Sequence, residues 1–317
     1  MLFILVVLFL GCGKSSNNQT QDPKVKHLKI AVVTNNSSDW WTIARKGGDQ
    51  AASELQNVEL DFRMLPEGTA AAQKTLVDDL IVRGVDALLV SPIDVENQKQ
   101  MLDDAAAKTL LFTLGADAPN SNRALYAGSD DLESGKMAGE MVKKVLPNGG
   151  KIMVFVGRRD AQNAIDRLNG LRQGIEGGNI EILDVITDGA DVAKAKTNAT
   201  ETLVKYPRID GLVGLWSYNT PAILNAAKDA NKLGQVKIIG FDEDDQTLQG
   251  IKDGHVFATV VQQPYEFTFD AVKRAVAILR GDKSQIPADK KAIFPTQVIQ
   301  QDNVDKFWSQ LKTLRGR

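Results

Sequence analysis

The chain has 317 residues, a formal net charge of −2 at pH 7 and a hydrophobic content of 43%. This length is sufficient for two domains, and the composition is that of an ordinary soluble protein. The near-neutral charge argues against nucleic acid as a partner, because the single local basic cluster (Arg158, Arg159, Arg167 and Arg172) is too small to form a basic stripe.

The chain begins with an apolar run, Met1 to Leu10, which is followed by Cys12, its only cysteine. Ten apolar residues are too few to span a bilayer but fit the apolar core of a secretory signal peptide. A lone cysteine directly after such a core resembles a bacterial lipobox, although Phe9 and Leu10 depart from the usual pattern. We therefore expect residues 1–12 to be a signal peptide that ends at a lipidated Cys12. An unlipidated signal, a short anchor and a start codon further upstream stay open as alternatives.

The next segment, residues 13–26, is polar and has no apolar periodicity. It predicts a disordered tether between the membrane and the folded part of the chain. Because no cysteine follows Cys12, the folded part is expected to have no disulfide bonds.

The first folded element is predicted at Leu28–Val33, an apolar run typical of a buried strand. Small polar residues and two adjacent tryptophans, Trp40 and Trp41, then lead into a helical pattern from Thr42 to Leu55. Strand-like and helical segments alternate along the rest of the chain, which predicts an α/β fold. The further predicted strands are Val58–Arg63, Ala87–Ser91, Leu110–Leu114, Leu125–Ala127, Lys151–Val156, Ile180–Ile186, Gly211–Leu215, Val236–Phe241, Phe257–Val261 and Ala292–Val298. Examples of the helical patterns are Ala70–Val82, Leu132–Val145 and Val192–Val204.

Three strand segments recur in the same order at a nearly constant offset. Lys29–Val33 resembles Lys151–Phe155 at an offset of 122 residues (151 − 29), and Glu59–Phe62 resembles residues 181–184 at the same offset. Asp86–Val90 resembles residues 210–214 at an offset of 124 (210 − 86). The repeat predicts two similar parallel-sheet lobes. We expect residues 27–129 plus 264–291 to form lobe 1 and residues 130–263 plus 292–317 to form lobe 2, with a hinged cleft between them.

The sequence offers little support for catalysis. The two histidines, His27 and His255, have no evident nucleophile or metal partner, and no nucleophile elbow, zinc-binding helix or dinucleotide-binding glycine pattern occurs. The acidic run Asp242–Asp245 lacks the glycine and the distal glutamate of a calcium loop, so the start of a solvated helix is the favoured interpretation. We therefore predict no enzyme activity, no cofactor and no metal site.

Polar and aromatic residues follow several predicted strands, at the edge of a parallel sheet where ligands bind. Adjacent residues on a helix point in different directions, so Trp40 and Trp41 cannot both belong to one narrow core stripe. One ring in the core and the other over a helix end is an alternative to ligand contact. Hydroxyl groups suit such polar side chains, and flat aromatic faces cover the C–H faces of a sugar ring. A small, neutral, hydroxyl-rich ligand is predicted.

From about His27 to Val298 the chain resembles bacterial periplasmic sugar-binding proteins of the ribose/galactose type, which are the substrate-capture components of ABC importers. The resemblance rests on segments 90–92, 115–119, 128–139, 239–242 and 258–264 taken together. It implies a class I periplasmic binding protein fold that closes on its ligand about a hinge. It also implies a periplasmic location, a sugar or polyol ligand, and partners in the permease subunits of an importer, with a chemoreceptor as a further candidate.

The residues that the resemblance places at the ligand site are Ser38, Trp40, Trp41, Asp117, Arg167, Asp191, Trp216, Asn219, Asp242 and Gln262. Trp40 and Trp41 stand where the family has a phenylalanine pair, and we expect Trp41 to stack on the ligand deeper in the cleft than Trp40. Trp216 stands where ribose binders have asparagine, and Asn219 is a candidate replacement for that amide.

Ribose itself is put in doubt at one place, because Gly115-Ala116 replaces the Asp-Arg pair of ribose binders and Asp117 comes two residues later. Replacement of Asp242 or Arg167 by alanine is expected to remove sugar binding without unfolding the protein.

Three other functions stay open at this point. The same fold can pass a sugar or autoinducer signal to a chemoreceptor or sensor kinase, act as the effector domain of a transcription repressor, or carry an enzyme. The N-terminal segment does not predict a DNA-binding helix pair, and no acid–base constellation favours an enzyme. Which sugar is bound and the oligomeric state are not predicted.

Overall fold

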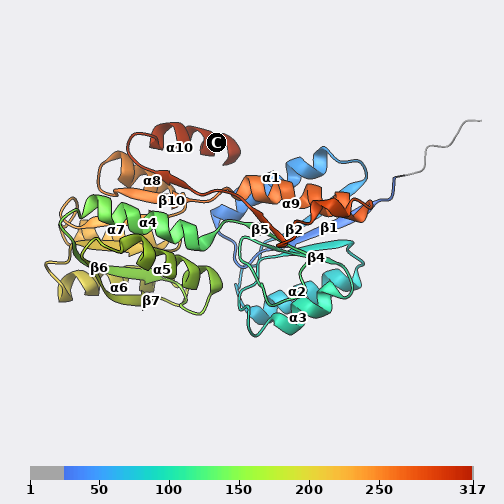
Figure 1. Cartoon of the computed structure of the whole chain (residues 1–317), viewed down its shortest axis with the longest axis horizontal. Coiled ribbons are helices and arrows are strands. Elements are labelled where there is room, and N and C mark those ends of the chain that lie inside the picture. Colours follow the sequence, from blue (N-terminus) through green and yellow to red (C-terminus); the bar gives the residue numbers. More distant parts are fainter. Residues whose placement is uncertain (1–24, 316–317) are drawn as a thin grey trace, which may run out of the picture.

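The computed structural model describes residues 25–315, which form two α/β lobes side by side along the long axis of the molecule (Figure 1). The predicted signal peptide, the lipidation of Cys12 and nearly all of the predicted tether lie outside the described residues. Among the described residues, no helix is long and apolar enough to cross a bilayer.

The first lobe is built on a six-stranded parallel sheet with the order β11-β5-β4-β3-β1-β2. Alternate residues of β1 face opposite sides of this sheet. Leu28, Ile30 and Val32 pack with α1 and α9, whereas Ala31 and Val33 pack with α2 and α3. The strands are β1 (Leu28–Val33), β2 (Val58–Arg63), β3 (Ala87–Val90), β4 (Leu110–Leu114), β5 (Leu125–Gly128) and β11 (Lys291–Ile293).

The second lobe repeats this plan with the order β12-β10-β9-β8-β6-β7, in which only β12 runs antiparallel. Strands β6 to β10 take the same relative places as β1 to β5, which confirms the repeat read from the sequence. The strands are β6 (Gly150–Val156), β7 (Ile180–Thr187), β8 (Gly211–Gly214), β9 (Lys237–Phe241), β10 (Ala258–Val261) and β12 (Gln297–Ile299).

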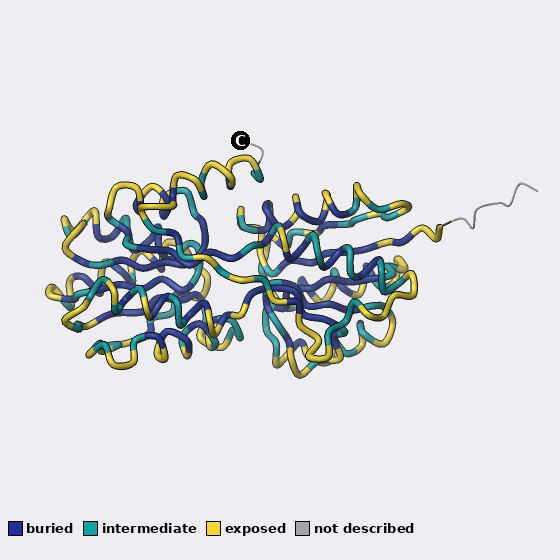
Figure 2. The backbone as a smooth tube through the Cα atoms, turned by 45° about the horizontal axis from the view of Figure 1, so that its top comes forward, coloured by how far each residue is buried: buried dark blue, intermediate teal, exposed yellow. Residues whose placement is uncertain are grey.

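Helices cover both faces of each sheet, and the inner strands are buried, whereas the edge strands β2 and β7 are only partly buried (Figure 2). In the second lobe α4 and α5 pack closely because glycines line their contact; a Cβ atom at Gly170 would lie 1.9 Å from the carbonyl oxygen of Leu132. The helices are α1 (Asp39–Ser53), α2 (Ala70–Val82), α3 (Lys99–Ala106), α4 (Asp131–Val145), α5 (Gln162–Ile175), α6 (Val192–Lys205), α7 (Asn219–Asp229), α8 (Asp245–Lys252), α9 (Pro264–Leu279), the short 3-10 turn η1 (Lys283–Gln285) and α10 (Val304–Arg315).

One predicted strand is wrong. Ala292–Val298 was expected to be a single strand, but the structure divides it into β11 in the first sheet and β12 in the second. Pro295 lies between the two and has no backbone N–H to donate to a strand ladder, which accounts for the break. Residues 294–296 therefore run from one lobe to the other, together with residues 129–130 and 262–263.

The two lobes also touch away from these connections. Helix α10 of the second lobe contacts α1 of the first, and the buried Ile43 of α1 belongs to the same apolar cluster as Leu311 of α10. This contact lies a few residues from the tryptophans at the start of α1, so it helps to fix the position of that helix relative to the second lobe.

Candidate functional site

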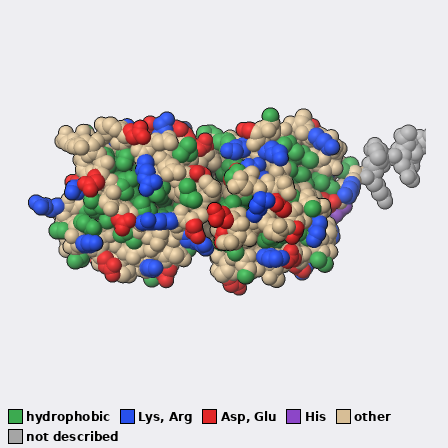
Figure 3. Space-filling view, turned by 60° about the horizontal axis from the view of Figure 1, so that its bottom comes forward, with side chains coloured by type: hydrophobic (Ala, Val, Ile, Leu, Met, Phe, Trp, Pro, Cys, Tyr) green, Lys and Arg blue, Asp and Glu red, His purple; other side chains and the backbone are tan. Residues whose placement is uncertain are grey.

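The carboxyl ends of both sheets face the space between the lobes. Residues 129–130 follow the carboxyl end of β5, residues 262–263 follow that of β10, and each pair leads into the other lobe. The loops that follow the parallel strands therefore meet where the lobes meet, which is the usual ligand position in such sheets. Figure 3 shows a narrow waist at this place, with acidic side chains gathered near it.

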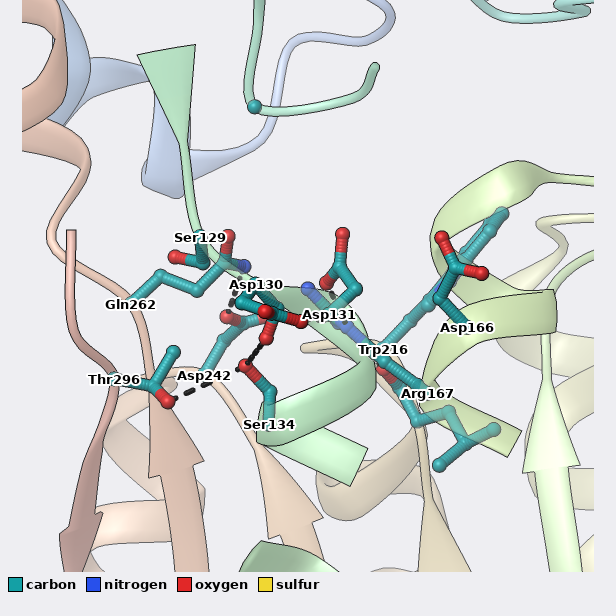
Figure 4. Close-up of polar contacts among 12 residues, drawn as sticks. Ser129, Asp130, Asp131, Ser134, Asp166, Arg167, Trp216, Asp242, Gln262 and Thr296 are labelled. Carbon is teal, nitrogen blue, oxygen red and sulfur yellow. Dashed lines mark hydrogen bonds and ion pairs between the residues drawn. The ribbon is translucent and has the colours of Figure 1, made fainter. Parts of the chain in front are cut away.

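A buried ion pair forms the centre of the site on the second lobe. Arg167 of α5 donates from Nε to Oδ1 of Asp131, the first residue of α4, over 2.7 Å, and from Nη1 to the carbonyl oxygen of Leu215 over 2.7 Å (Figure 4). The guanidinium carbon lies 4.6 Å from the ring centre of Phe241. Because water is excluded, the hydrogen bonds of Arg167 are stronger than they would be at the surface, and they fix the position of its guanidinium.

Each member of this pair shifts the pKa of the other toward its charged form, while burial opposes both shifts. Burial raises the pKa of Asp131 to about 6, against the lowering effect of Arg167, and Asp166 and Asp242 raise it further. Burial works to lower the pKa of Arg167, but Asp131 and Asp242 outweigh it and the pKa is raised. The guanidinium is therefore charged, and the carboxylates around it are not fully compensated.

Asp242 follows β9 with a positive φ of 62°, which turns its side chain into this cluster. Its Oδ2 lies 3.8 Å from Nη1 of Arg167, and its Oδ1 accepts a hydrogen bond from Nε2 of Gln262 over 2.9 Å (Figure 4). Burial raises the pKa of Asp242, against Arg167 and the Gln262 amide. Gln262 is only 7% exposed and its Oε1 has no hydrogen-bond partner. An orphaned buried acceptor of this kind is costly unless a ligand supplies a donor.

On the first lobe the two tryptophans have different environments. Trp41 is 2% exposed, lies in the core and donates from Nε1 to Oδ1 of Asn35 over 3.0 Å. Trp40 is half-buried, packs edge-on against Trp41 with ring centres 4.7 Å apart, and has an Nε1 without a partner. Trp41 is thus the deeper ring, as expected, but it is a core residue and Trp40 is the more accessible of the two, so the expected stacking of Trp41 on the ligand does not fit its burial.

Trp216 follows β8 on the second lobe and lies over Gly157, where a Cβ atom would come 2.1 Å from its Cζ3. Its Nε1 is buried without a partner. Asn219 does not replace a ligand-facing amide, since it is 0% exposed. It accepts from the backbone N–H of Trp216 over 3.0 Å and donates to Oδ2 of Asp188 over 2.9 Å. Asn219 therefore holds the turn that carries Trp216.

Asp188 is the centre of that supporting network. The hydroxyl of Tyr218 donates to its Oδ1 over 2.6 Å, and the backbone N–H of Ala190 donates to the same oxygen over 2.8 Å. Burial raises the pKa of Asp188 even though three donors lower it. The network joins the turns after β7 and β8 and fixes the direction of the Trp216 ring.

The other three predicted residues are placed away from the buried cluster or are engaged within the protein. Asp117 forms a two-point ion pair with Arg123, with Nη2 2.7 Å from Oδ2, and also accepts from the hydroxyl of Thr113. Asp191 is exposed and caps α6 by accepting from two backbone N–H groups. Ser38 is half-buried at the N-cap of α1 and makes no side-chain cap hydrogen bond.

Sequence reasoning missed several residues of the site, among them Ser129, Asp131, Asp166 and Asp188. Ser129 is 2% exposed with an unpartnered Oγ, and Asp166 is half-buried with only Gln162 as a hydrogen-bond donor. The sequence singles out the segment 128–131 as the boundary between lobes and as part of the family resemblance, but not as part of the ligand site. Its consecutive aspartates at the start of a helix were the available signal, but the pairing with Arg167 joins residues 36 positions apart.

The arrangement offers hydrogen bonding without a reactive group. The described residues contain no cluster of three or more His, Cys, Asp or Glu side chains that could hold a metal ion. Asp244 caps α8, while Asp242 and Glu243 are buried, so the acidic run is only partly a solvated helix start. What the cluster presents is a set of carboxylates, a guanidinium, an amide oxygen and indole N–H groups, which together suit hydroxyl groups.

Comparison with known proteins gives consistent matches over most of the chain. A family model for the periplasmic binding protein domain matches residues 30–283. The ribose import binding protein RbsB of Haemophilus influenzae is 30% identical over 295 residues, which are 90% of this chain and 96% of that protein. The ribose import binding protein RbsB of Bacillus subtilis is 28% identical over 277 residues, covering 86% of this chain and 87% of that protein.

Two solved structures have the same fold. An ABC transporter solute-binding protein of Burkholderia graminis in complex with D-arabinose matches with a TM-score of 0.83 and 24% identity, covering 88% of this chain and 96% of that chain. GanP, a glucose-galactose binding protein of Geobacillus stearothermophilus, matches with a TM-score of 0.83 and 22% identity, covering 88% and 99%. At this identity the likeness concerns the architecture of two parallel-sheet lobes.

Proposed function

The chain belongs to the periplasmic binding protein family, and from this premise we propose that it captures a small sugar between its lobes and delivers it to an ABC importer. It is a sugar-binding solute-binding protein rather than an enzyme, as its relatives are. The observation that carries the proposal is the buried, unpartnered Oε1 of Gln262 beside Asp242 and Arg167. A buried acceptor next to charged groups is stabilised when a ligand hydroxyl donates to it.

The proposed sugar contacts come from both lobes. Trp216, Asp242 and Gln262 contribute from the second lobe, and Arg167 with Asp131 forms the floor beneath them. Trp40 contributes from the first lobe, where its free Nε1 can donate to a ligand oxygen. Trp41, Asp117, Asp191 and Asn219 support the fold around the site instead, since each has partners within the protein. Ser38 is half-buried at the start of α1 and is retained as a candidate rim contact.

Binding is proposed to close the lobes about the three connections at residues 129–130, 262–263 and 294–296. Periplasmic binding proteins are a named example of such hinge closure. A sugar that touches both lobes favours the closed form through contacts that the open form lacks. We propose lobe limits that move residues 292–293 to lobe 1, because β11 pairs with β5, and that otherwise follow the limits expected from the repeat.

The names of the relatives support part of the proposal for the chemical class of the ligand. Two of them are named for ribose import, and further relatives are a xylitol-binding protein of Mycolicibacterium smegmatis and a xylose/arabinose-binding protein of Sulfolobus acidocaldarius. These names support a monosaccharide or polyol as the ligand. The replacement of the Asp-Arg pair by Gly115 and Ala116 favours a sugar other than ribose.

The family implies a periplasmic location, and we propose that a lipid on Cys12 tethers the protein to the membrane beside the permease subunits. The support is the apolar run before Cys12 and the polar segment after it, both in the sequence alone. Mass spectrometry of the membrane fraction tests the lipid directly: a Cys12→Ala variant should lose both the added mass and the membrane association.

A thermal-shift screen tests the central proposal. Ribose, arabinose, xylose, allose, glucose, galactose, tagatose and xylitol would each be added to the purified chain from residue 25 onward. At least one is expected to raise the melting temperature in proportion to the logarithm of its concentration. No shift with any of these sugars or polyols would contradict the proposal.

A further inference from the structure

We propose that the sugar carries a protonated amine, so that the natural ligand is an amino sugar whose ammonium group lies against the carboxylates of the second lobe. This inference rests on the proposed function, because it concerns the same interlobe site. It is carried by the charge balance of the site and by a buried acceptor that lacks a donor.

The site has more acidic than basic groups. Asp131, Asp166 and Asp242 lie near enough for the latter two to act electrostatically on Asp131. A single guanidinium, that of Arg167, is shared between Asp131 at 2.7 Å and Asp242 at 3.8 Å. Asp166 has an amide from Gln162 as its hydrogen-bond donor and feels only a distant lowering effect from Lys291. Among the described residues, Asp131 and Asp242 therefore share one cation, and Asp166 has no cation within ion-pair distance.

Each of these carboxyl groups is disfavoured as an anion. Burial raises the pKa of Asp131, of Asp166 and of Asp242, and neighbouring carboxylates add to the effect at Asp131 and Asp166. A ligand cation placed among them would reverse this penalty, because an opposite charge within a few ångströms favours the ionised form. A neutral sugar would leave the excess negative charge in place, and an anionic sugar would add to it.

Gln262 gives a separate indication of a donor on the ligand, at the Asp242 end of this cluster (Figure 4). Its Nε2 is fixed on Asp242, so its Oε1 is held in one orientation as a pure acceptor. That oxygen is buried and has no partner. Figure 4 shows the free sides of Asp131 and Asp166 directed away from the helices that carry them, toward the first lobe. An ammonium group has three N–H donors and no acceptor, which matches a surface composed mainly of acceptors.

The aromatic residues are compatible with the same ligand. Trp216 comes from the second lobe and Trp40 from the first, and both have an unpartnered Nε1 that can donate to a ring or hydroxyl oxygen. Indole faces also attract cations. The proposed site therefore has donors for the sugar oxygens on its aromatic side and acceptors for the ammonium on its acidic side.

Calorimetry at pH 7 with matched sugars tests the inference. The probes are D-glucose and D-galactose, their 2-amino forms, 3-amino-3-deoxy-D-glucose, 6-amino-6-deoxy-D-glucose, N-acetyl-D-glucosamine and D-glucuronate. We expect at least one amino sugar to bind ten times or more tighter than its neutral parent. The acetylated form, which keeps the nitrogen but loses the charge, should lose the gain, and glucuronate should bind weakest.

Two variants show whether the carboxylates are responsible. Asp166→Asn removes one charge with little change of shape and should reduce the preference for the amino sugar at least threefold. Asp229→Asn, which removes a surface carboxylate paired with Lys196, should leave the preference unchanged. The inference is overturned if neutral parents bind as tightly as all their amino forms, or if Asp166→Asn leaves the ratio unaltered. Absence of binding by every probe would instead count against the proposed sugar-binding function.

Discussion

Arg167 and Asp131 form a buried ion pair that joins the second turn of α5 to the first residue of α4, with Nε 2.7 Å from Oδ1 and neither residue more than 8% exposed. The pair also places the guanidinium near Asp242 and over Phe241. The same arginine therefore supports the fold and the proposed ligand site. A buried charge that loses its partner costs far more than a surface pair.

Replacement of Arg167 by methionine is therefore expected to destabilise the protein as well as to impair sugar binding. This differs from the clean loss of binding expected from the sequence. The free energy of unfolding should fall by about 3 to 5 kcal/mol, because Asp131 is left buried and unpaired. The double variant Arg167→Met/Asp131→Leu should recover a large part of that loss in urea unfolding while still binding no sugar. A single variant as stable as the wild type would refute the structural role of the pair.

The two adjacent tryptophans are expected to respond differently to replacement by phenylalanine. Trp40→Phe should reduce the change of tryptophan emission on ligand saturation and weaken binding, since its half-buried ring is the proposed contact from the first lobe. Trp41→Phe should keep the ligand-induced change but lower stability by about 1 to 3 kcal/mol, because it loses the bond to Asn35 and core contacts. Loss of the emission change only in Trp41→Phe would show that Trp41 is the ring that contacts the ligand, as expected from the sequence.

Gly157 is expected to tolerate no side chain if Trp216 is to stay in place. An added Cβ atom would lie 2.1 Å from Cζ3 of Trp216 and 2.6 Å from the hydroxyl oxygen of Tyr218. Gly157→Ala should therefore displace the ring and weaken sugar binding at least tenfold. Gly189→Ala is a control in a neighbouring loop, where a Cβ atom meets nothing within 4 Å; it should retain binding despite some backbone strain from its positive φ. Equal affinity of Gly157→Ala and the wild type would contradict a role for Trp216.

Glu243 is expected to make stability decrease as pH rises. Both its carboxyl oxygens are buried without a partner, and burial, followed by the charge of Asp242, raises its pKa from 4.5 to about 8. Between these values the folded protein binds a proton that the unfolded chain has released, so the free energy of unfolding falls with pH. Glu243→Gln should gain about 1 to 3 kcal/mol over the wild type between pH 5 and pH 8.

Urea unfolding at pH 5, 6.5 and 8 measures this difference, with Glu201→Gln as a control because Glu201 is exposed on α6. The control should differ from the wild type by the same small amount at every pH. If the gain in the free energy of unfolding of Glu243→Gln over the wild type does not increase with pH, the pKa of Glu243 is not raised in the folded protein and the prediction is wrong.

The regular elements of this fold are largely predictable from the sequence. Apolar runs such as Leu28–Val33 fill one strand each, because strands buried on both faces are continuous in hydrophobicity. The near-constant offset between Lys29 and Lys151 reflects two lobes with the same strand order. The exception is the segment around Pro295, which reads as one apolar strand. The segment is divided between two sheets because the chain crosses from one lobe to the other there. The local pattern of apolar residues does not predict where such a crossing occurs.

The site was predictable in its position but not in the role of each residue. Position along the chain places Asp242 and Gln262 after β9 and β10, where they do meet. The sequence position does not reveal that Asn219 donates a hydrogen bond to Asp188, that Asp117 forms an ion pair with Arg123, or that Trp41 packs in the core. Each of these outcomes depends on which polar group from a distant segment arrives nearby, and a single sequence carries little information on such pairs.

The most direct test of sugar capture is a calorimetric titration of the wild type and of Asp242→Asn with the sugar that gives the largest thermal shift. Asp242 accepts from Gln262 and lies beside Arg167, so the amide variant keeps the shape of the site but removes the acceptor charge. We predict one site per wild-type chain and at least a hundredfold weaker binding in Asp242→Asn, with the melting temperature of the free protein maintained. Equal affinity in the two proteins would contradict the proposed interlobe site.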